Sequence, residues 1–304
     1  MNTLSDPTLP LAFALPVLLF LLLWAVFYFV LGAFGISLQY AAQLASVKIA
    51  RSSFETWAVA QPGGKRLRPY APILLVLALG GITASGAGQL FVGLSEHFRL
   101  TTSWIYFADH AVNAWFQNER HLGLTLLLSA VTTVGGPLGM GLCATAVVAI
   151  LLLRHHRAPA VFVMLCSGGG ALLDLALKMI FERTRPDVAL AIASAQGYSF
   201  PSGHAMGSTV VLGSIGYLVL RGSLPWKAKS AWLAALVAAV ILIGLSRVYL
   251  GVHWFSDIAA GWSAGTVWLA TGCVAFETYL RVQDLHRGAP LPGKGVDTAL
   301  QHPS

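Results

Sequence analysis

Residues 158–180 read APAVFVMLCSGGGALLDLALKMI, an apolar run whose only charged side chains are Asp174 and Lys178. A helix needs about 20 predominantly apolar residues to cross a bilayer, so this run predicts a transmembrane helix. The whole chain has the same character: 56% of its 304 residues are hydrophobic, 10% are charged, and the mean hydropathy is +0.71. Since a soluble domain carries about a quarter charged residues, we predict an all-α polytopic membrane protein.

Six further apolar stretches on either side of this run are candidate spans. They cover residues 10–36, 70–94, 131–153, 203–220, 230–249 and 256–279. The first stretch is longer than the apolar region of a cleavable signal peptide, and no basic segment precedes it. We therefore expect a membrane helix bundle with up to seven spans, the first of which is a retained N-terminal span.

Residues 101–120 show a different pattern, with apolar and polar side chains on opposite faces of a helix. One face would carry Trp104, Phe107, Ala111 and Trp115, and the other Asp109, His110, Asn113 and Gln117. Such a segment is typical of a helix that lies at the membrane surface, with its apolar face in the lipid. An ordinary amphipathic helix packed on the bundle would have the same pattern, so both interpretations stay open.

The basic residues indicate a membrane orientation, and no nucleic-acid partner is expected. The net charge is +7, but Lys and Arg stand at the ends of apolar runs and form no long block. With the N-terminus outside, the inner loops and tail hold most of them, as cytoplasmic segments usually do. These are Lys48, Arg51, Lys65, Arg66, Arg68, Arg154, Arg157, Arg221, Lys227, Lys229, Arg281, Arg287 and Lys294. The outer cations include those of the three motifs described next, so we expect the motifs to face outward, which in a bacterial inner membrane is the periplasm or exterior.

The cysteines give no sign of a disulfide framework or a zinc site. Cys143, Cys166 and Cys273 all lie inside apolar runs. Small buried hydrophobic side chains are the simplest interpretation.

The first motif reads K-x6-R-P and comprises Lys178, Arg185 and Pro186. Seven residues are two helical turns, so a helix that continued to Pro186 would place both cations on one face. Arg183 would point away from that face, and we interpret it as an interfacial charge. Taken alone, the motif is as typical of two cations that end a membrane span.

The second motif is Pro201-Ser202-Gly203-His204, at the start of the apolar run 203–220. Serine is a good N-cap, and glycine lets a ligand approach the backbone closely. The free amides and positive dipole end of a helix start favour an anion, which His204 would flank.

The third motif reads S-R-x5-H-x3-D and comprises Ser246, Arg247, His253 and Asp257. Residues four apart are neighbours on a helix, so the carboxylate of Asp257 could hold one tautomer of His253. The planar fork of Arg247 matches phosphate oxygens. Together the three motifs supply cations, two histidines, a carboxylate and a helix start, which is a set suited to phosphoryl transfer.

These three motifs resemble the signature of the type 2 phosphatidic acid phosphatase superfamily, which includes bacterial lipid phosphatases and shares its site with vanadium haloperoxidases. The resemblance covers residues 70–280 and implies that family's six-span helical core. On this basis, we divide the chain into an N-terminal span with a basic cytoplasmic loop (1–69), the phosphatase-like domain (70–280) and a polar, disordered cytoplasmic tail (281–304).

The resemblance also implies a role for each motif residue. His253 would be the nucleophile that forms a phosphohistidine, Asp257 would orient it, and His204 would protonate the leaving oxygen and then activate water. The phosphoryl oxygens would be bound by Lys178, Arg185, Ser202, Gly203 and Arg247. No metal or other cofactor is implied, because the cations can supply the charge and the sequence has no cluster of Asp and Glu suited to holding a metal.

The expected substrate is a membrane lipid phosphate, and no obligate protein partner is evident. Undecaprenyl diphosphate is favoured because the segment between the first two motifs is short and carries no polar domain for a large sugar headgroup. Phosphatidylglycerol phosphate and lipid A remain alternatives, as does a phosphotransferase that uses another lipid as acceptor. A transporter of anions or lipids is an alternative of another class, and Asp174 is the clearest charge within a span that could serve it, unless it pairs with Lys178.

Overall fold

The computed structural model describes residues 71–186 and 191–286, and every regular element in these two ranges is an α-helix. The helices are α4 (Ala71–His97), α5 (Trp104–Asn118), α6 (Leu122–Val134), α7 (Pro137–Leu153), α8 (Arg157–Phe181), α9 (Gly203–Arg221), α10 (Trp226–Tyr249) and α11 (Phe255–His286). The predicted span 10–36 and the loop that follows it lie outside the described residues, as does most of the predicted tail.

Five of these helices are long and apolar enough to cross a membrane, namely α4, α8, α9, α10 and α11. The pair α6 and α7 forms a sixth candidate that is bent by 49°. The predicted all-α membrane core is therefore confirmed, and it has six spans if the bent pair crosses the membrane as one. Two boundaries were wrong: the span predicted at 131–153 begins at Leu122 and breaks at Gly135–Gly136, and α11 continues to His286, so residues 281–286 are helical.

The break between α6 and α7 follows from three consecutive residues. Gly135 and Gly136 weaken the helix, and Pro137 lacks the amide hydrogen that would continue it but suits the first position of α7. A side chain at Gly135 would collide with Ile243 of α10, so the glycine also lets α6 pack closely on that helix.

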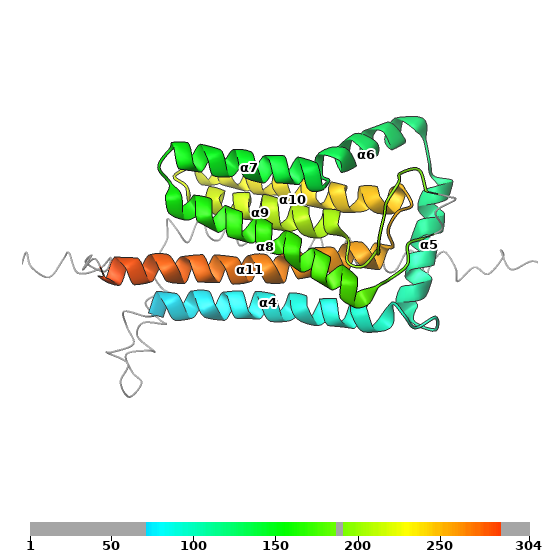
Figure 1. Cartoon of the computed structure of the whole chain (residues 1–304), viewed down its shortest axis with the longest axis horizontal. Helices are drawn as coiled ribbons and strands as arrows, with labels where there is room; N and C mark the ends of the chain where they lie inside the picture. Colours follow the sequence, from blue (N-terminus) through cyan, green and yellow to red (C-terminus); the bar gives the residue numbers. More distant parts are fainter. Residues whose placement is uncertain (1–70, 187–190, 287–304) are drawn as a thin grey trace, which may run out of the picture.

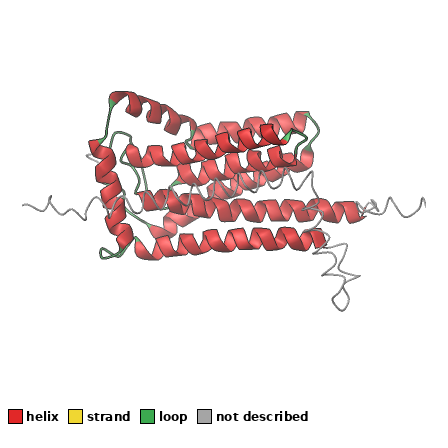
Figure 2. Ribbon diagram, turned by 180° about the vertical axis from the view of Figure 1, so that it is seen from behind, coloured by secondary structure: helices red, strands yellow, loops and turns green. Residues whose placement is uncertain are grey.

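The long helices run roughly parallel to one another, and α5 lies across one end of the bundle (Figure 1). In the reverse view, α5 again closes that end, and α4 lies beside α11 (Figure 2). The start of α9 packs closely on α11 at Gly261, where a side chain would lie 2.7 Å from the carbonyl oxygen of Ser202. The second and third motifs are thus brought together by backbone packing.

The helix α5 is oriented opposite to an ordinary amphipathic helix. Its polar residues Asp109 and Asn113 are buried, at 1% and 4% exposure. Trp104, Phe107 and Trp115 are instead 68%, 61% and 59% exposed. The helix therefore packs on the bundle through Asp109 and Asn113 and leaves its apolar side chains exposed, so the interpretation as an ordinary amphipathic helix packed on the bundle was wrong.

Candidate active site

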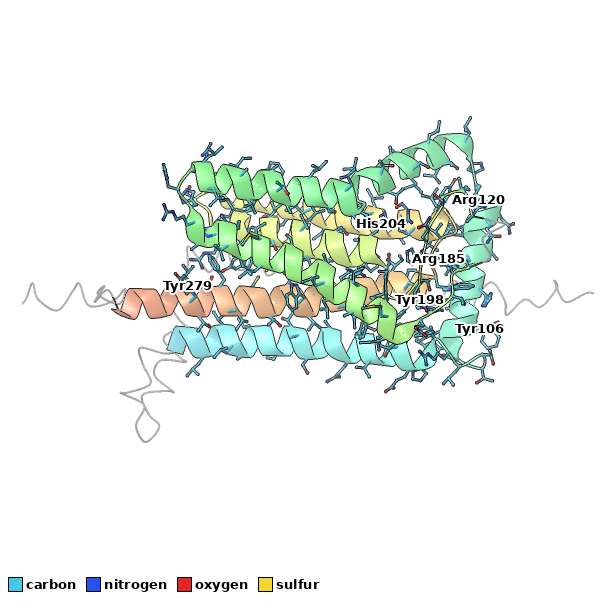
Figure 3. All side chains as sticks on the ribbon, viewed as in Figure 1. Tyr106, Arg120, Arg185, Tyr198, His204 and Tyr279 are labelled. Atoms are coloured by element: carbon cyan, nitrogen blue, oxygen red, sulfur yellow. The ribbon has the colours of Figure 1, made fainter. Side chains whose placement is uncertain are left out.

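All three motifs meet at the end of the bundle that α5 covers. Lys178 comes from the last turn of α8, His204 from the first turn of α9, and Arg247 from the last turn of α10. His253 lies in the turn before α11, and Asp257 lies in the first turn of that helix. Figure 3 shows His204 and Arg185 near each other at this end, beside α5.

His253 and Asp257 form the expected pair, although His253 lies in the turn before α11 and does not share a helix face with Asp257. Nδ1 of His253 lies 3.2 Å from Oδ2 of Asp257 and donates its hydrogen to that oxygen, which also accepts the backbone N–H of Trp254 at 2.9 Å. The two side chains are almost fully buried, at 2% and 0% exposure. Because the carboxylate fixes the Nδ1–H tautomer, the lone pair of His253 is on Nε2.

Burial also keeps this histidine neutral. It lowers the pKa of His253 to about 4, although the hydrogen bond and negative charge of Asp257 act in the opposite direction. At neutral pH, Nε2 is therefore unprotonated, which is the form that a nucleophile requires.

Arg185 lies directly beside this nitrogen, with Nη1 at 3.1 Å from Nε2 of His253. The same guanidinium donates to the carbonyl oxygen of Val252 and to the carbonyls of residues 196, 197 and 198. A web of backbone acceptors therefore fixes a cation where the oxygens of a phosphoryl group attacked by His253 would lie.

The path of the chain between Lys178 and Arg185 differs from the prediction. The helix α8 ends at Phe181, and its C-cap Glu182 has a left-handed conformation with φ 47°. Lys178 and Arg185 therefore do not share a helix face, and the first reaches the site from the helix and the second from the loop. The residue before a proline disfavours the helical conformation, so a helix running to Pro186 was already disfavoured.

Lys178 is anchored beside the second motif. Its Nζ donates to both carboxylate oxygens of Asp174, at 2.6 and 2.7 Å, and to the carbonyl of Pro201 at 2.9 Å. A side chain at Gly203 would lie 3.1 Å from this Nζ and 2.7 Å from Oδ2 of Asp174. Only glycine therefore allows the start of α9 to approach the ion pair so closely. Of the two interpretations of Asp174, the structure supports the pairing with Lys178.

Ser202 occupies the N-cap position of α9, but its side chain makes no capping hydrogen bond. Its Oγ is buried and has no hydrogen-bond partner among the residues that the structure describes. The predicted capping contact is thus wrong, and a buried hydroxyl is left available for a ligand. An unsatisfied buried polar group is costly unless a ligand completes it.

The hydrogen bonds of the Arg247 guanidinium are also incomplete. Its Nη1 donates to Oγ1 of Thr132 on α6 at 2.8 Å, while its Nε is buried without a partner in the described part of the chain. Thr132 was not predicted, because residues 131–153 were treated as one continuous span. At the break in that span, a side chain on Gly136 would lie 3.2 Å from Nε2 of His204, so this glycine borders the second histidine.

Arg183 is the largest departure from the prediction. It is 8% exposed, and its guanidinium pairs with Asp257 and with Asp109, each at 2.7 Å. It is therefore a buried partner of the site and no interfacial charge. A basic residue two positions from Arg185 and an acidic residue on the amphipathic segment were visible in the sequence, but nothing in their spacing linked them.

The site has the electrostatic character of an anion-binding pocket. The positive charges of Arg247, Lys178 and Arg185 all act on His204. In the described ranges 71–186 and 191–286, no group of three or more His, Cys, Asp or Glu side chains could hold a metal ion. The arrangement can therefore bind a phosphate group between a neutral histidine and several cations.

Comparisons with known proteins place this geometry in a family. The profile of the PAP2 superfamily matches residues 159–281, which contain all three motifs. Phosphatidylglycerophosphatase B of Bacillus subtilis (strain 168) is 31% identical over 166 residues, or 54% of this chain and 81% of that relative. The chain belongs to the PAP2 superfamily.

Two further similarities agree with this membership. An undecaprenyl-diphosphatase of Sulfolobus acidocaldarius is 40% identical to this PAP2 protein over 81 residues, which are 27% of this chain and 34% of that relative. The crystal structure of a transmembrane PAP2-type phosphatidylglycerolphosphate phosphatase from Bacillus subtilis superposes with a TM-score of 0.57 and 25% identity, covering 67% of this chain and 96% of the other. This PAP2 protein is therefore an integral membrane protein of the lipid phosphatase family.

Proposed function

We propose that this protein hydrolyses a membrane lipid phosphate or diphosphate through a phosphohistidine on His253. The observation that carries the proposal is the environment of Nε2 of His253. The nitrogen is unprotonated, it is oriented through Nδ1 by Asp257, and it lies 3.1 Å from the guanidinium of Arg185. A phosphoryl group placed there would meet a nucleophile and a cation together.

In the first step, Nε2 would form a bond to the terminal phosphorus as the bond from that phosphorus to its bridging oxygen breaks, so that the lipid alcohol or, for a diphosphate, the lipid monophosphate departs. His204, protonated when the phosphate dianion is bound, would give its proton to the departing lipid oxygen. In the second step, water would attack the phosphohistidine, His204 would take a proton from that water, and the P–N bond would break to release inorganic phosphate. Asp257 would stabilise the imidazolium form of His253 without taking its proton.

The phosphoryl oxygens would be held by residues whose hydrogen bonds are incomplete without a ligand. Ser202 Oγ and Arg247 Nε are buried and unpartnered in the described residues, and Gly203 offers the first free amide of α9. Lys178 and Arg185 would add the remaining charge. These contacts would replace the metal ions that other phosphoryl-transfer sites use, so we propose a metal-independent reaction.

We propose that the site faces the periplasm or exterior of a bacterial inner membrane. The basic residues Arg154 and Arg157 lie at the turn between α7 and α8, and Lys227 and Lys229 follow the turn between α9 and α10. Both turns are at the opposite end of the bundle from α5 (Figure 1). The excess of positive charge expected in the cytoplasm therefore supports an outward site.

Among lipids, undecaprenyl diphosphate is the proposed substrate, because the segment between Pro186 and Pro201 is short and leaves no polar domain for a large headgroup. Phosphatidylglycerol phosphate is the second candidate, because the relative matched over most of its length is named for that activity. Phosphate release from each lipid by the purified protein, beside His253→Ala, tests both. Release that persists in His253→Ala would refute the mechanism, and transfer to an added acceptor lipid without phosphate release would indicate a phosphotransferase.

A further inference from the structure

Arg183 and Asp109 belong to a closed set of hydrogen bonds behind the catalytic pair. Nη1 of Arg183 donates to Oδ1 of Asp257 and to Oγ of Ser256, both at 2.7 Å. Its Nη2 donates to Oδ2 of Asp109 at 2.7 Å. Ser256 closes the ring, because its Oγ donates to Asp109 Oδ2 at 2.5 Å and its backbone N–H donates to Oδ1 at 2.8 Å. Every polar contact in this ring is buried.

The ring divides the two oxygens of Asp257 between two tasks. Oδ1 accepts from Arg183, while Oδ2 accepts from Nδ1 of His253 and from the backbone of Trp254. A carboxylate held at both oxygens cannot rotate, so the direction of its bond to His253 is fixed. Without Arg183, Oδ1 would have no partner that the structure shows, and the carboxylate could turn.

Asp109 fixes Arg183 in turn, and it comes from a distant part of the chain. It lies on α5, where burial raises its pKa and the neighbouring positive charge of Arg183 opposes that rise. Its carboxylate also accepts the N–H of Ser256 in the first turn of α11, where a negative charge is favoured by the helix dipole. The helix across the end of the bundle is thereby tied to the helix that carries Asp257.

We propose that Arg183 and Asp109 are positioning residues, which hold the Asp257 carboxylate in the one orientation that aims Nε2 of His253 at the phosphoryl group. The inference rests on the proposed function, because it acts through the nucleophile assigned there. Neither residue touches the substrate in this account. Arg183 sets the carboxylate, and Asp109 sets Arg183.

A cavity on the far side of the ring makes the inference testable. Arg183 and Asp109 line a space of about 470 Å³, together with Arg99, Tyr106, His110 and Trp254. A shortened side chain at position 183 would extend this space, and water or a small cation could enter it. In the variant Arg183→Ala, added methylguanidinium could therefore enter this space and replace the lost group.

The experiment measures phosphate release in detergent by the full-length protein and its variants, from undecaprenyl diphosphate or dioctanoyl phosphatidylglycerol phosphate, whichever the wild-type protein hydrolyses. We expect kcat of Arg183→Ala to fall roughly 100-fold with KM within about twofold, because misorientation of a reacting group affects turnover while the cations that bind phosphate stay in place. Millimolar methylguanidinium should restore a large part of kcat with saturation. The matched control Arg99→Ala removes another arginine of the same cavity. Its guanidinium donates to the carbonyl oxygen of Phe181 and lies 5.5 Å from the centre of the Phe98 ring, so this variant should keep kcat and show no rescue.

Asp109→Asn provides a second variant that keeps size and the contact to Ser256. Its kcat should fall about 10-fold at unchanged KM, so the test holds even if Arg183→Ala does not fold. If Arg183→Ala or Asp109→Asn folds and its kcat equals that of the control Arg99→Ala, the inference is overturned. The inference would also be overturned if kcat fell and KM rose by the same factor, together with a lowered unfolding temperature and no rescue by methylguanidinium. That result would mark a purely structural role. Wild-type activity in His253→Ala would overturn the proposed function itself, and with it this inference.

Discussion

The hydrogen bond between Arg247 and Thr132 allows the clearest quantitative prediction. Thr132→Val keeps the shape of the side chain but removes the acceptor that lies 2.8 Å from Nη1 of Arg247. Both residues are largely buried, at 8% and 6% exposure, so the guanidinium has little access to bulk water as a substitute. The variant therefore leaves a charged donor unsatisfied and free to turn away from the phosphoryl oxygens.

The size of the effect follows from the strength of such bonds. A hydrogen bond to a charged group contributes about 1.5–3 kcal/mol, and about 1.4 kcal/mol corresponds to a tenfold change. If the loss falls on the transition state, kcat/KM should decrease roughly 10- to 100-fold, towards the lower end where a water molecule enters beside the valine. Inhibition by orthovanadate, which mimics the five-coordinate phosphoryl group, should weaken in parallel.

The neighbouring residue supplies a matched control. Thr133 donates its hydroxyl to the carbonyl of Ser129 within α6 and is exposed. Thr133→Val therefore makes the same chemical change one position away without touching Arg247. Equal kcat/KM values for Thr132→Val and Thr133→Val, measured with the lipid that the wild-type protein hydrolyses, would refute the reasoning that Thr132 orients Arg247.

Three further predictions concern protonation, metal and topology. Because burial lowers the pKa of His253 to about 4, its imidazole should gain a proton only as pH falls through about 4, which ¹⁵N-histidine NMR in detergent would detect; a midpoint near the ordinary 6.5 would contradict the buried site. Phosphate release should persist in excess EDTA because cations of the chain neutralise the phosphate, whereas a strict requirement for a divalent metal would exclude that account. In intact cells, Gln196→Cys should react with a membrane-impermeant thiol reagent and Lys227→Cys should not, because the two exposed positions lie at opposite ends of the bundle; the reverse pattern would invert the proposed orientation.

Much of the candidate site was predictable because most of its residues belong to three short sequence motifs. The pairing of His253 with Asp257 depends only on a spacing of four residues, and the structure shows that contact. The long membrane helices follow from the length of the apolar runs, which the order of residues reveals. Local spacing and hydropathy therefore suffice where a feature depends on a single helical turn or a single helix.

The features that the sequence did not reveal depend on contacts between distant segments. Arg183 was interpreted as a surface charge because α8 was extended to Pro186, whereas the helix ends at Phe181 and the turn directs Arg183 inward. Asp109 on the polar face of α5 is buried because it meets that arginine, which lies 74 residues away in the chain. Thr132 and Gly136 were missed because one bent pair of helices was treated as a straight span, although Gly135-Gly136-Pro137 is a signal that predicts a break.

The most direct test of the central claim is to trap the covalent intermediate. His204→Ala should slow the hydrolysis of the phosphoenzyme, so the variant incubated briefly with a ³²P-labelled lipid phosphate should accumulate label. We predict an acid-labile, base-stable phosphoryl group on the peptide that contains His253, absent from the double variant His204→Ala, His253→Ala. Turnover by the wild-type protein with inversion of configuration at phosphorus, and with no label on His253 in any variant, would contradict the account because it would show direct transfer to water.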